Sequence, residues 1–380
     1  MFTPKILHLI RTIVKVLECT KLFPFSWDDE NNNLIVSSSK VTAIWTQFFC
    51  LHYPPYFLFT VYQLYNSLKY GCHGVMDNYW MVMMGVGHII CGEGVWGPYT
   101  KKREQVNFFQ QVVSFDAKMK DLVIPQKSSN IIRKSEKFAT LIIKANTIAA
   151  VTGPIFMNLV YILKPTAPQY IYHAYPDHSA TCANWAFLVM EIYMKSINII
   201  GAMLFQGWFL CSVLFELTVL SMLKKSSSPL HTKITYYKYL SFVNHLHNQC
   251  YPAGMLPLRV GIFGCMTITS SVILIRMIDR IHVFEQVIIL QFLITMITVP
   301  FLFLSIAGKI VEDSLDLKES MGQENTGRNF KVNRKILKSL KPFGVKVGPI
   351  RAVNYNAFNA FVTNVISGLT TVLVSYPNLK

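Results

Sequence analysis

Apolar segments alternate with polar and charged stretches along the whole 380-residue chain. A helix rises about 1.5 Å per residue, so about 20 apolar residues are needed to cross the hydrocarbon core of a bilayer. Seven segments come close to this length or exceed it: residues 41–68, 79–99, 138–163, 184–223, 261–278, 285–308 and 354–376. The pattern predicts an all-α membrane protein with seven transmembrane helices.

Basic residues are concentrated in four of the stretches that flank these segments. Twenty-nine of the 36 Lys and Arg residues lie in residues 1–40, 101–137, 224–259 and 309–351. The three remaining loops carry one basic residue each. Because basic loops stay in the cytoplasm, we expect a cytoplasmic N-terminus and an extracellular C-terminus. A G-protein-coupled receptor has the opposite orientation, so the charge pattern disfavours that class.

Two parts of the chain are expected to be helical outside the membrane. The fourth segment, residues 184–223, is about twice as long as a bilayer requires, and we expect it to continue into the cytoplasm. There it would meet residues 234–260, in which aromatic and polar residues alternate. Near the N-terminus Ile6, Ile10 and Val14 share one helix face, which indicates an amphipathic helix on the inner membrane surface.

Composition excludes several classes of protein. The chain is 52% hydrophobic and 15% charged, which is too apolar for an ordinary soluble core of this length. A net charge of +16 would suit nucleic acid, but the basic residues flank apolar segments. Anionic membrane lipid is therefore the expected partner. The sequence contains no catalytic, metal-binding or cofactor-binding motif that we recognise, so we expect neither enzymatic activity nor a cofactor.

Ionisable residues inside the apolar segments are candidate functional groups. His88, Glu93, Glu191 and Lys195 all lie within predicted spans, where such residues are rare and often functional. Glu191 and Lys195 are one helical turn apart and can neutralise each other. A structural pair and a ligand contact fit this spacing equally well.

Two of the eight cysteines, Cys72 and Cys182, fall in predicted outer loops. Outside the cell a disulfide persists, whereas cytoplasmic thiols are kept reduced. A bridge between these two residues and a pair of free thiols are equally compatible with the sequence.

The last segment has no charged residue but carries a stripe of polar ones. At 100° per residue one helix face collects Asn356, Asn359, Thr363, Ser367, Thr370, Val374 and Asn378. The opposite face is apolar. Packing against other helices would explain a few such groups, but a stripe along the whole span favours a helix that lines a water-filled pore. One helix cannot enclose a pore, so a symmetric oligomer is expected.

The lead-in to this segment reads Gly348-Pro349-Ile350-Arg351-Ala352-Val353-Asn354. Together with the seven-span pattern and Thr370, it resembles the arthropod gustatory and odorant receptor superfamily, the insect-type seven-transmembrane chemoreceptors. The resemblance departs from the family pattern where Thr371 replaces a tyrosine and where Pro377-Asn378 replace Gln-Phe. These departures are typical of a divergent member.

The resemblance implies a ligand-gated, non-selective cation channel of the plasma membrane that a small tastant or odorant opens. It implies a tetramer of identical or mixed subunits, with or without a co-receptor subunit, and a gate at Val374. It also places a small-molecule pocket in the outer half of the bundle. The aromatic and Met side chains expected at that depth are Trp80, Met84, Met157, Tyr161, Phe187, Met190 and Tyr193. For each of them a place in the core or against lipid is the alternative.

Four regions follow from these arguments. Residues 1–40 form a cytoplasmic amphipathic segment, and residues 41–308 form a six-helix ligand-binding bundle with cytoplasmic extensions. Residues 309–353 form cytoplasmic linker and anchor helices, and residues 354–380 hold the pore-lining helix. A G-protein-coupled receptor is the alternative function, and a transporter is a third. The third span lacks Asp-Arg-Tyr and the seventh lacks Asn-Pro-x-x-Tyr, and no paired half-repeats are found.

Overall fold

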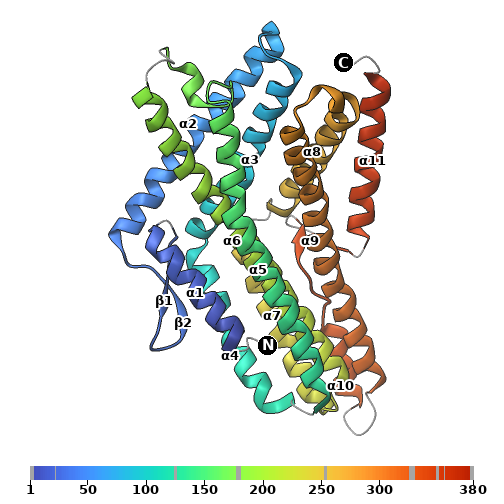
Figure 1. Ribbon diagram of the computed structural model, residues 1–380. Helices are drawn as coiled ribbons and strands as arrows, with labels where there is room; N and C mark the ends of the chain where they lie inside the picture. Colours follow the sequence, from blue (N-terminus) through green and yellow to red (C-terminus); the bar gives the residue numbers. More distant parts are fainter. Residues whose placement is uncertain are drawn as a thin grey trace.

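The computed structural model describes residues 4–21, 23–123, 126–176, 181–251, 255–324, 330–347, 351–354 and 356–376. Long helices run along one another and build a tall bundle (Figure 1). In chain order the elements are α1 (Pro4–Thr20), β1 (Phe25–Asp28), β2 (Asn33–Val36), α2 (Lys40–Tyr70), α3 (Val75–Thr100), α4 (Lys102–Val123), α5 (Gln126–Leu163), η1 (Ile171–Ala174), α6 (Thr181–Lys225), α7 (Leu230–Cys250), α8 (Met255–Met277), η2 (Ile278–Arg280), α9 (Val283–Gln323), α10 (Phe330–Ser339), β3 (Lys346–Val347), β4 (Arg351–Ala352) and α11 (Ala357–Ser375).

Helices occupy all seven apolar segments that the sequence pattern identifies. Among the described residues, five stretches are long and apolar enough to cross a membrane: 130–163, 181–225, 255–280, 283–323 and 357–375. The helices α2 and α3 have 31 and 26 residues but do not reach the same hydropathy. In α2, polar residues such as Gln47, His52 and Gln63 interrupt the apolar positions. These helices are typical of a membrane protein, and α2 and α3 are less apolar than the other five.

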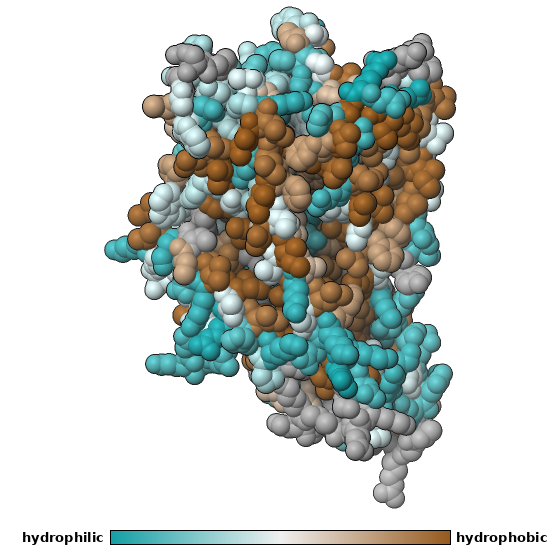
Figure 2. All heavy atoms as spheres, viewed as in Figure 1, coloured by the Kyte–Doolittle hydropathy of each residue, from teal (hydrophilic) through white to brown (hydrophobic). Residues whose placement is uncertain are grey.

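Three helices are much longer than the roughly 20 residues that a bilayer requires. These are α5 with 38 residues, α6 with 45 and α9 with 41. The lower parts of α6 and α9 pack on α7, and α7 packs on α4, in a second layer below the upper bundle (Figure 1). Figure 2 shows apolar side chains over much of the bundle and a hydrophilic band beneath them. The expected helical extension of residues 184–223 is thus present in α6.

Aromatic side chains from distant parts of the chain fill the lower layer. Phe115 of α4 stacks on Tyr239 of α7 with ring centroids 4.7 Å apart. Phe209 of α6 stacks on Phe303 of α9, also at 4.7 Å. The hydroxyl of Tyr237 donates a hydrogen bond to the Lys341 carbonyl at 3.1 Å. These contacts join α4 to α7, α6 to α9, and α7 to the segment that precedes the last helix.

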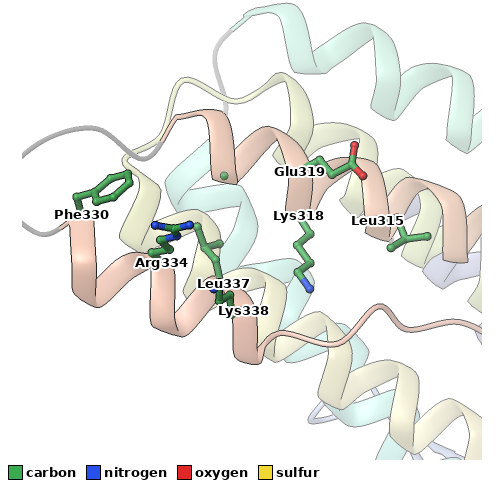
Figure 3. A pocket seen from close by; sticks show the side chains of 8 residues that line it. Leu315, Lys318, Glu319, Phe330, Arg334, Leu337 and Lys338 are labelled. Atoms are coloured by element: carbon green, nitrogen blue, oxygen red, sulfur yellow. The ribbon is translucent and has the colours of Figure 1, made fainter.

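The short helix α10 packs against the end of α9 within the region expected to hold anchor helices. An open cleft of about 430 Å³ lies between the two helices. Figure 3 shows Phe330 and Arg334 on the α10 side and Lys318 and Glu319 on the α9 side. The Arg334 guanidinium lies 5.9 Å from the centre of the Phe330 ring. The cleft therefore has a mainly basic lining at the lower end of the molecule.

The N-terminal helix uses its apolar face for packing inside the protein. Ile6, Ile10, Val14 and Leu17 are all buried, and α1 contacts α5 and the hairpin of β1 and β2. The expectation that this face lies in the membrane surface is therefore wrong. Polar residues on the opposite side hold the hairpin, because Asp29 accepts from Arg11 and Lys15.

The helices α3 and α6 approach each other closely at one glycine. A Cβ atom placed on Gly94 would lie 2.7 Å from the Cα atom of Ala202. Real side chains do not tolerate such a distance, so only glycine permits this crossing. The contact fixes α3 against the helix that carries Glu191 and Lys195.

Of the two alternatives that the sequence left open for Cys72 and Cys182, the structure has the pair of free thiols. Cys72 follows the C-terminal end of α2, Cys182 lies at the start of α6, and both are exposed free thiols. Loop assignment places residues on one side of a membrane without bringing them together, which is why this pairing could not be read from the sequence.

Candidate ligand-binding site and last helix

An aromatic cluster lies around η1, the end of α5 and the start of α6, in the part of the bundle that the sequence predicts to be the outer half. Met84, Tyr161, Tyr170 and Tyr172 are buried together, with Met157 and Phe187 packed against them. The Tyr161 and Tyr170 rings meet edge to face at 4.9 Å, and the Tyr172 and Phe187 rings are 5.3 Å apart. We call these six residues the outer cluster. It brings together α3, α5, α6 and η1 around a largely apolar centre.

Four of the seven pocket candidates from the sequence belong to this cluster: Met84, Met157, Tyr161 and Phe187. The other three lie elsewhere. Trp80 is buried in the main core next to Tyr79, with ring centroids 5.4 Å apart. Met190 packs on a smaller core around Val95, and Tyr193 is 37% exposed and faces Trp45 at 6.3 Å. These three therefore do not share one pocket with the other four.

A buried ion pair adjoins the outer cluster. Lys195 Nζ lies 3.2 Å from Glu191 Oε2, and their side chains are only 4% and 1% exposed. Lys195 also donates to the Met157 carbonyl at 3.3 Å, and its ammonium lies 4.4 Å from the centre of the Tyr170 ring. The Tyr56 hydroxyl donates to Glu191. Removing two charges from water is unfavourable unless such partners compensate, so this network is a fixed and specific feature of α6.

Tyr170 comes from the loop between α5 and α6, and its side chain is buried. Burial raises the pKa of its hydroxyl, and the Glu191 carboxylate raises it further. The hydroxyl therefore stays protonated at physiological pH, while the ring faces the Lys195 ammonium. An ammonium over an aromatic face gains about 2 kcal/mol when both are shielded from water. The loop thus closes the outer end of the ion-pair network.

His88 of α3 lies in the same part of the bundle. It is 5% exposed, and its ring packs on Tyr56 at 4.6 Å and on Tyr53 at 5.4 Å. Its Nε2 atom has no hydrogen-bond partner among the described residues. A buried polar nitrogen without a partner is unfavourable, so His88 offers a bonding position to a polar molecule that reaches it.

The other ionisable group singled out in the sequence, Glu93, lies lower on α3. Arg259 Nε lies 2.9 Å from Glu93 Oε2, and the Arg259 side chain is 2% exposed. This pair joins α3 to the start of α8. The pair is separate from the outer cluster. It gives Glu93 a structural role in the contact between α3 and α8.

The last helix has one side packed on the bundle and one side open. Phe361 is buried, and Phe358 meets Phe301 of α9 at 4.9 Å. Arg276 of α8 donates to the Leu373 carbonyl at 3.0 Å. In Figure 1, α11 runs along the edge of the molecule beside α8 and α9. The apolar face expected from the sequence is the one that packs.

The polar stripe of α11 faces away from the rest of the chain. Six of the seven stripe residues are described, and all six are exposed: Asn356, Asn359, Thr363, Ser367, Thr370 and Val374. Asn378 lies outside the described residues. Val374 is 72% exposed. Only 6% of the membrane-length window of α11 is buried, against 28% to 56% in the other four candidate spans.

The hydroxyl groups of this stripe have local partners. Thr363 donates to the Asn359 carbonyl at 3.0 Å, and Thr370 donates to the Ile366 carbonyl at 2.9 Å. Such bonds satisfy the donor but leave the oxygen lone pairs facing outward. A membrane-length helix with an uncovered polar side is therefore the second candidate functional element.

Several partners in these sites were not identified from the sequence. Tyr56, Tyr170 and Arg259 complete the two ion-pair networks. Each is far from its partner along the chain, and a lone tyrosine in a loop or an arginine next to an apolar segment carries no signal for such a contact. Only the pairing of Glu191 with Lys195 could be predicted from the sequence, because the two residues are one helical turn apart.

Comparison with known proteins finds the same architecture in solved structures. No protein-family model and no curated protein sequence matches the chain. The structure of the insect olfactory receptor OR5 from Machilis hrabei matches with a TM-score of 0.75 and 11% identity, covering 96% of this chain and 97% of that chain. The same receptor in complex with eugenol matches with a TM-score of 0.76, the same identity and the same coverage. The resemblance inferred from the sequence is thus confirmed in its architecture: the chain has the fold of an insect olfactory receptor.

Proposed function

We propose that this chain is a chemosensory receptor that acts as a ligand-gated, weakly selective cation channel of the plasma membrane. The observation that carries the proposal is the uncovered polar stripe on α11. Lipid provides no partners for amide and hydroxyl groups, so this face needs water or another protein surface. Several copies of α11 around a common axis meet that need, because their stripes then line a water-filled path.

The oligomer that we propose is a tetramer, either of identical chains or with a co-receptor subunit. Its subunits cross the membrane seven times, with the N-terminus in the cytoplasm, because the basic stretches then face the cytoplasm. The lower layer, which includes α10, holds the subunits together. Residues 354–380 line the pore, and a ring of Val374 side chains closes it by excluding water.

The ligand in this proposal is a small organic tastant or odorant that binds at the outer cluster. The receptor OR5 from Machilis hrabei has been solved with eugenol, and the shared fold supports a ligand of similar size here. Met84, Met157 and Phe187 supply an adaptable apolar lining. A ligand that binds better to the conformer with separated α11 helices shifts the population toward the open pore.

Whole-cell recording tests this function. Cells that express the chain are exposed to a panel of sugars, bitter compounds and volatiles while G-protein signalling is blocked. We expect a fast cation current that persists under the block. A response that disappears under the block, from a chain whose N-terminal tag is reached from outside the cell, would contradict both the channel and its orientation.

A pair of variants on one helix tests the ligand site. Phe187 packs in the outer cluster, whereas Trp185, two residues earlier, is 61% exposed. Phe187→Ala removes a lining ring and should shift the half-maximal ligand concentration about tenfold or more, since burying such a ring is worth about 1.5–3 kcal/mol. Trp185→Ala serves as the control and should leave the dose response unchanged. Equal shifts for both variants would remove the outer cluster from the ligand site.

A further inference from the structure

A groove of about 800 Å³ lies between α5, α6 and α9, away from both the outer cluster and α11. Three lysines line it, one from each helix: Lys134, Lys225 and Lys309. Apolar side chains form another part of its wall, namely Phe138, Leu214 and Leu217. The groove is thus amphipathic, with a basic part and an apolar part in one open depression.

The basic part of the groove carries an excess of positive charge. Lys134, Lys225 and Lys309 are exposed and form no ion pair with a described residue. The adjacent Lys224 differs, because it pairs with Asp316 at 2.8 Å. Asp313 is the only carboxylate among the described lining residues. Burial raises the pKa of Asp313 and Lys309 opposes this rise, so the four groups together leave the groove cationic.

The apolar part of the groove lies on the side toward the membrane segments. Phe138 is one helical turn from Lys134 in the direction of the apolar stretch of α5, and it is 38% exposed. On α6 Leu214 precedes Lys225 by eleven residues, which is about 16 Å along a helix. On α9 Lys309 directly follows the apolar stretch that ends at residue 308. Lys134 and Lys309 therefore lie next to the ends of their predicted spans, and Phe138 extends the apolar wall from them toward the membrane. Lys225 lies lower, on the cytoplasmic extension expected for α6.

We propose that this groove binds an anionic phospholipid of the inner leaflet. The three ammonium groups hold its phosphate headgroup, and an acyl chain lies on Phe138, Leu214 and Leu217. Lysine ammonium groups bind phosphate as point charges, and basic residues beside membrane helices attract anionic lipid. The inner leaflet as the source of this lipid rests on the proposed orientation, with the basic stretches in the cytoplasm.

Lipid binding to the purified full-length chain in detergent tests the site. The probe is short-chain phosphatidylinositol bisphosphate, with phosphatidylcholine as the neutral lipid and inositol trisphosphate as the soluble phosphate. Native mass spectrometry counts bound molecules and reports the oligomeric state. Each lysine near an anionic lipid changes affinity about fivefold, so the triple variant K134Q/K225Q/K309Q should bind the anionic lipid about 100-fold more weakly.

Two further variants distinguish lipid binding in the groove from a general effect of the net charge of the protein. The control K238Q/K331Q/K335Q removes the same charge from exposed lysines outside the groove and should bind the anionic lipid normally. Phe138→Ala should weaken binding of the lipid without affecting inositol trisphosphate. An equal loss in both triple variants would contradict the proposal, and so would equal binding of the lipid and the soluble phosphate.

The experiment is independent of channel activity and of orientation. In detergent both faces of the protein are accessible, so lipid binding is measured whether or not a ligand opens a current. Labelling of an N-terminal tag in intact cells tests the orientation separately. If the groove triple variant changes the number of subunits in the complex but not the lipid affinity, the groove is a contact between copies of the chain and the lipid proposal is wrong.

Discussion

The buried ion-pair network beside the outer cluster and the polar stripe of the last helix differ in how their polar groups find partners. Next to the outer cluster, Glu191, Lys195 and Tyr56 are buried and bind one another across α2 and α6. On α11, Thr363 and Thr370 bond to the backbone of their own helix and remain exposed. Both α6 and α11 are long and apolar enough to cross a membrane. The polar groups of the buried network therefore find their partners within one chain. Those of the α11 stripe need water or other copies of the chain.

The largest expected effect comes from breaking the buried pair. Lys195→Met leaves the Glu191 carboxylate buried without its ammonium partner. Removal of one member of such a pair destabilises a protein by about 3–5 kcal/mol. We expect a strong decrease in the thermal unfolding temperature of the detergent-solubilised protein, measured by fluorescence-detected size exclusion.

The double variant Glu191→Gln/Lys195→Met is the control for this prediction. It removes both charges, so it should recover much of the lost stability. If the single and double variants unfold at the same temperature, the two charges do not compensate each other. That result would contradict the claim that the polar groups of this region are satisfied within one chain.

A smaller loss of stability is expected at the crossing of α3 and α6, which positions the pair. Gly94→Ala places a Cβ atom 2.7 Å from Ala202 Cα, and overpacking of this kind costs about 1–3 kcal/mol. Gly87 lies on the same helix with no atom within 4 Å of its added Cβ. Gly87→Ala should therefore leave the unfolding temperature unchanged or raise it slightly. Equal effects of the two variants would contradict a tight crossing.

Substitution in the polar stripe should separate stability from conduction. Ser367 is exposed in the single chain, so Ser367→Ala should change its unfolding free energy by no more than about 0.5 kcal/mol. In the proposed pore the same hydroxyl would face the permeating ions, so its loss should alter single-channel conductance. A marked loss of protomer stability with unchanged conductance would show that the stripe packs inside the protein.

The smallest effect is expected for the exposed pairs of the N-terminal hairpin. The hydrogen bond from Lys15, with the nearby Arg11 charge, lowers the pKa of Asp29 below 3.8. A carboxylate with a lowered pKa stabilises the fold above its unfolded-state pKa, and this contribution is lost as the pH falls through the folded value. Asp29→Asn should therefore be marginally less stable than the parent chain at pH 6, and the difference should be smaller at pH 3. Melting curves at both pH values would check this, and a larger difference at pH 3 would contradict it.

Much of the helical framework was predictable because hydropathy reports where lipid-compatible stretches lie. The predicted 354–376 agrees with α11 at Ala357–Ser375 to within three residues. The predicted end at residue 308 misses the last 15 residues of α9, which continues to Gln323. Hydropathy falls where charged residues begin, but a helix continues as long as its backbone bonds and packing permit.

The candidate sites were predictable only in part, because side-chain clusters depend on how helices rotate and cross. The stripe on α11 could be read from a single period of 100° per residue. The outer cluster required Tyr170 and Tyr172 to turn inward from a loop, and loops have no such period. Trp80 and Tyr193 have the right depth and chemistry, but rotation of their helices directs them to other neighbours.

The most direct test of the account is the resting current of two valine variants on the last helix. Val374 lies on the exposed stripe, whereas Val372 lies on the face toward the bundle and is only partly exposed. At equal surface expression, Val374→Ser should raise the resting cation current, because a polar ring no longer excludes water from the closed pore. Val372→Ser should leave the resting current unchanged. If Val374→Ser is silent, or both variants leak equally, α11 does not line a pore gated at Val374.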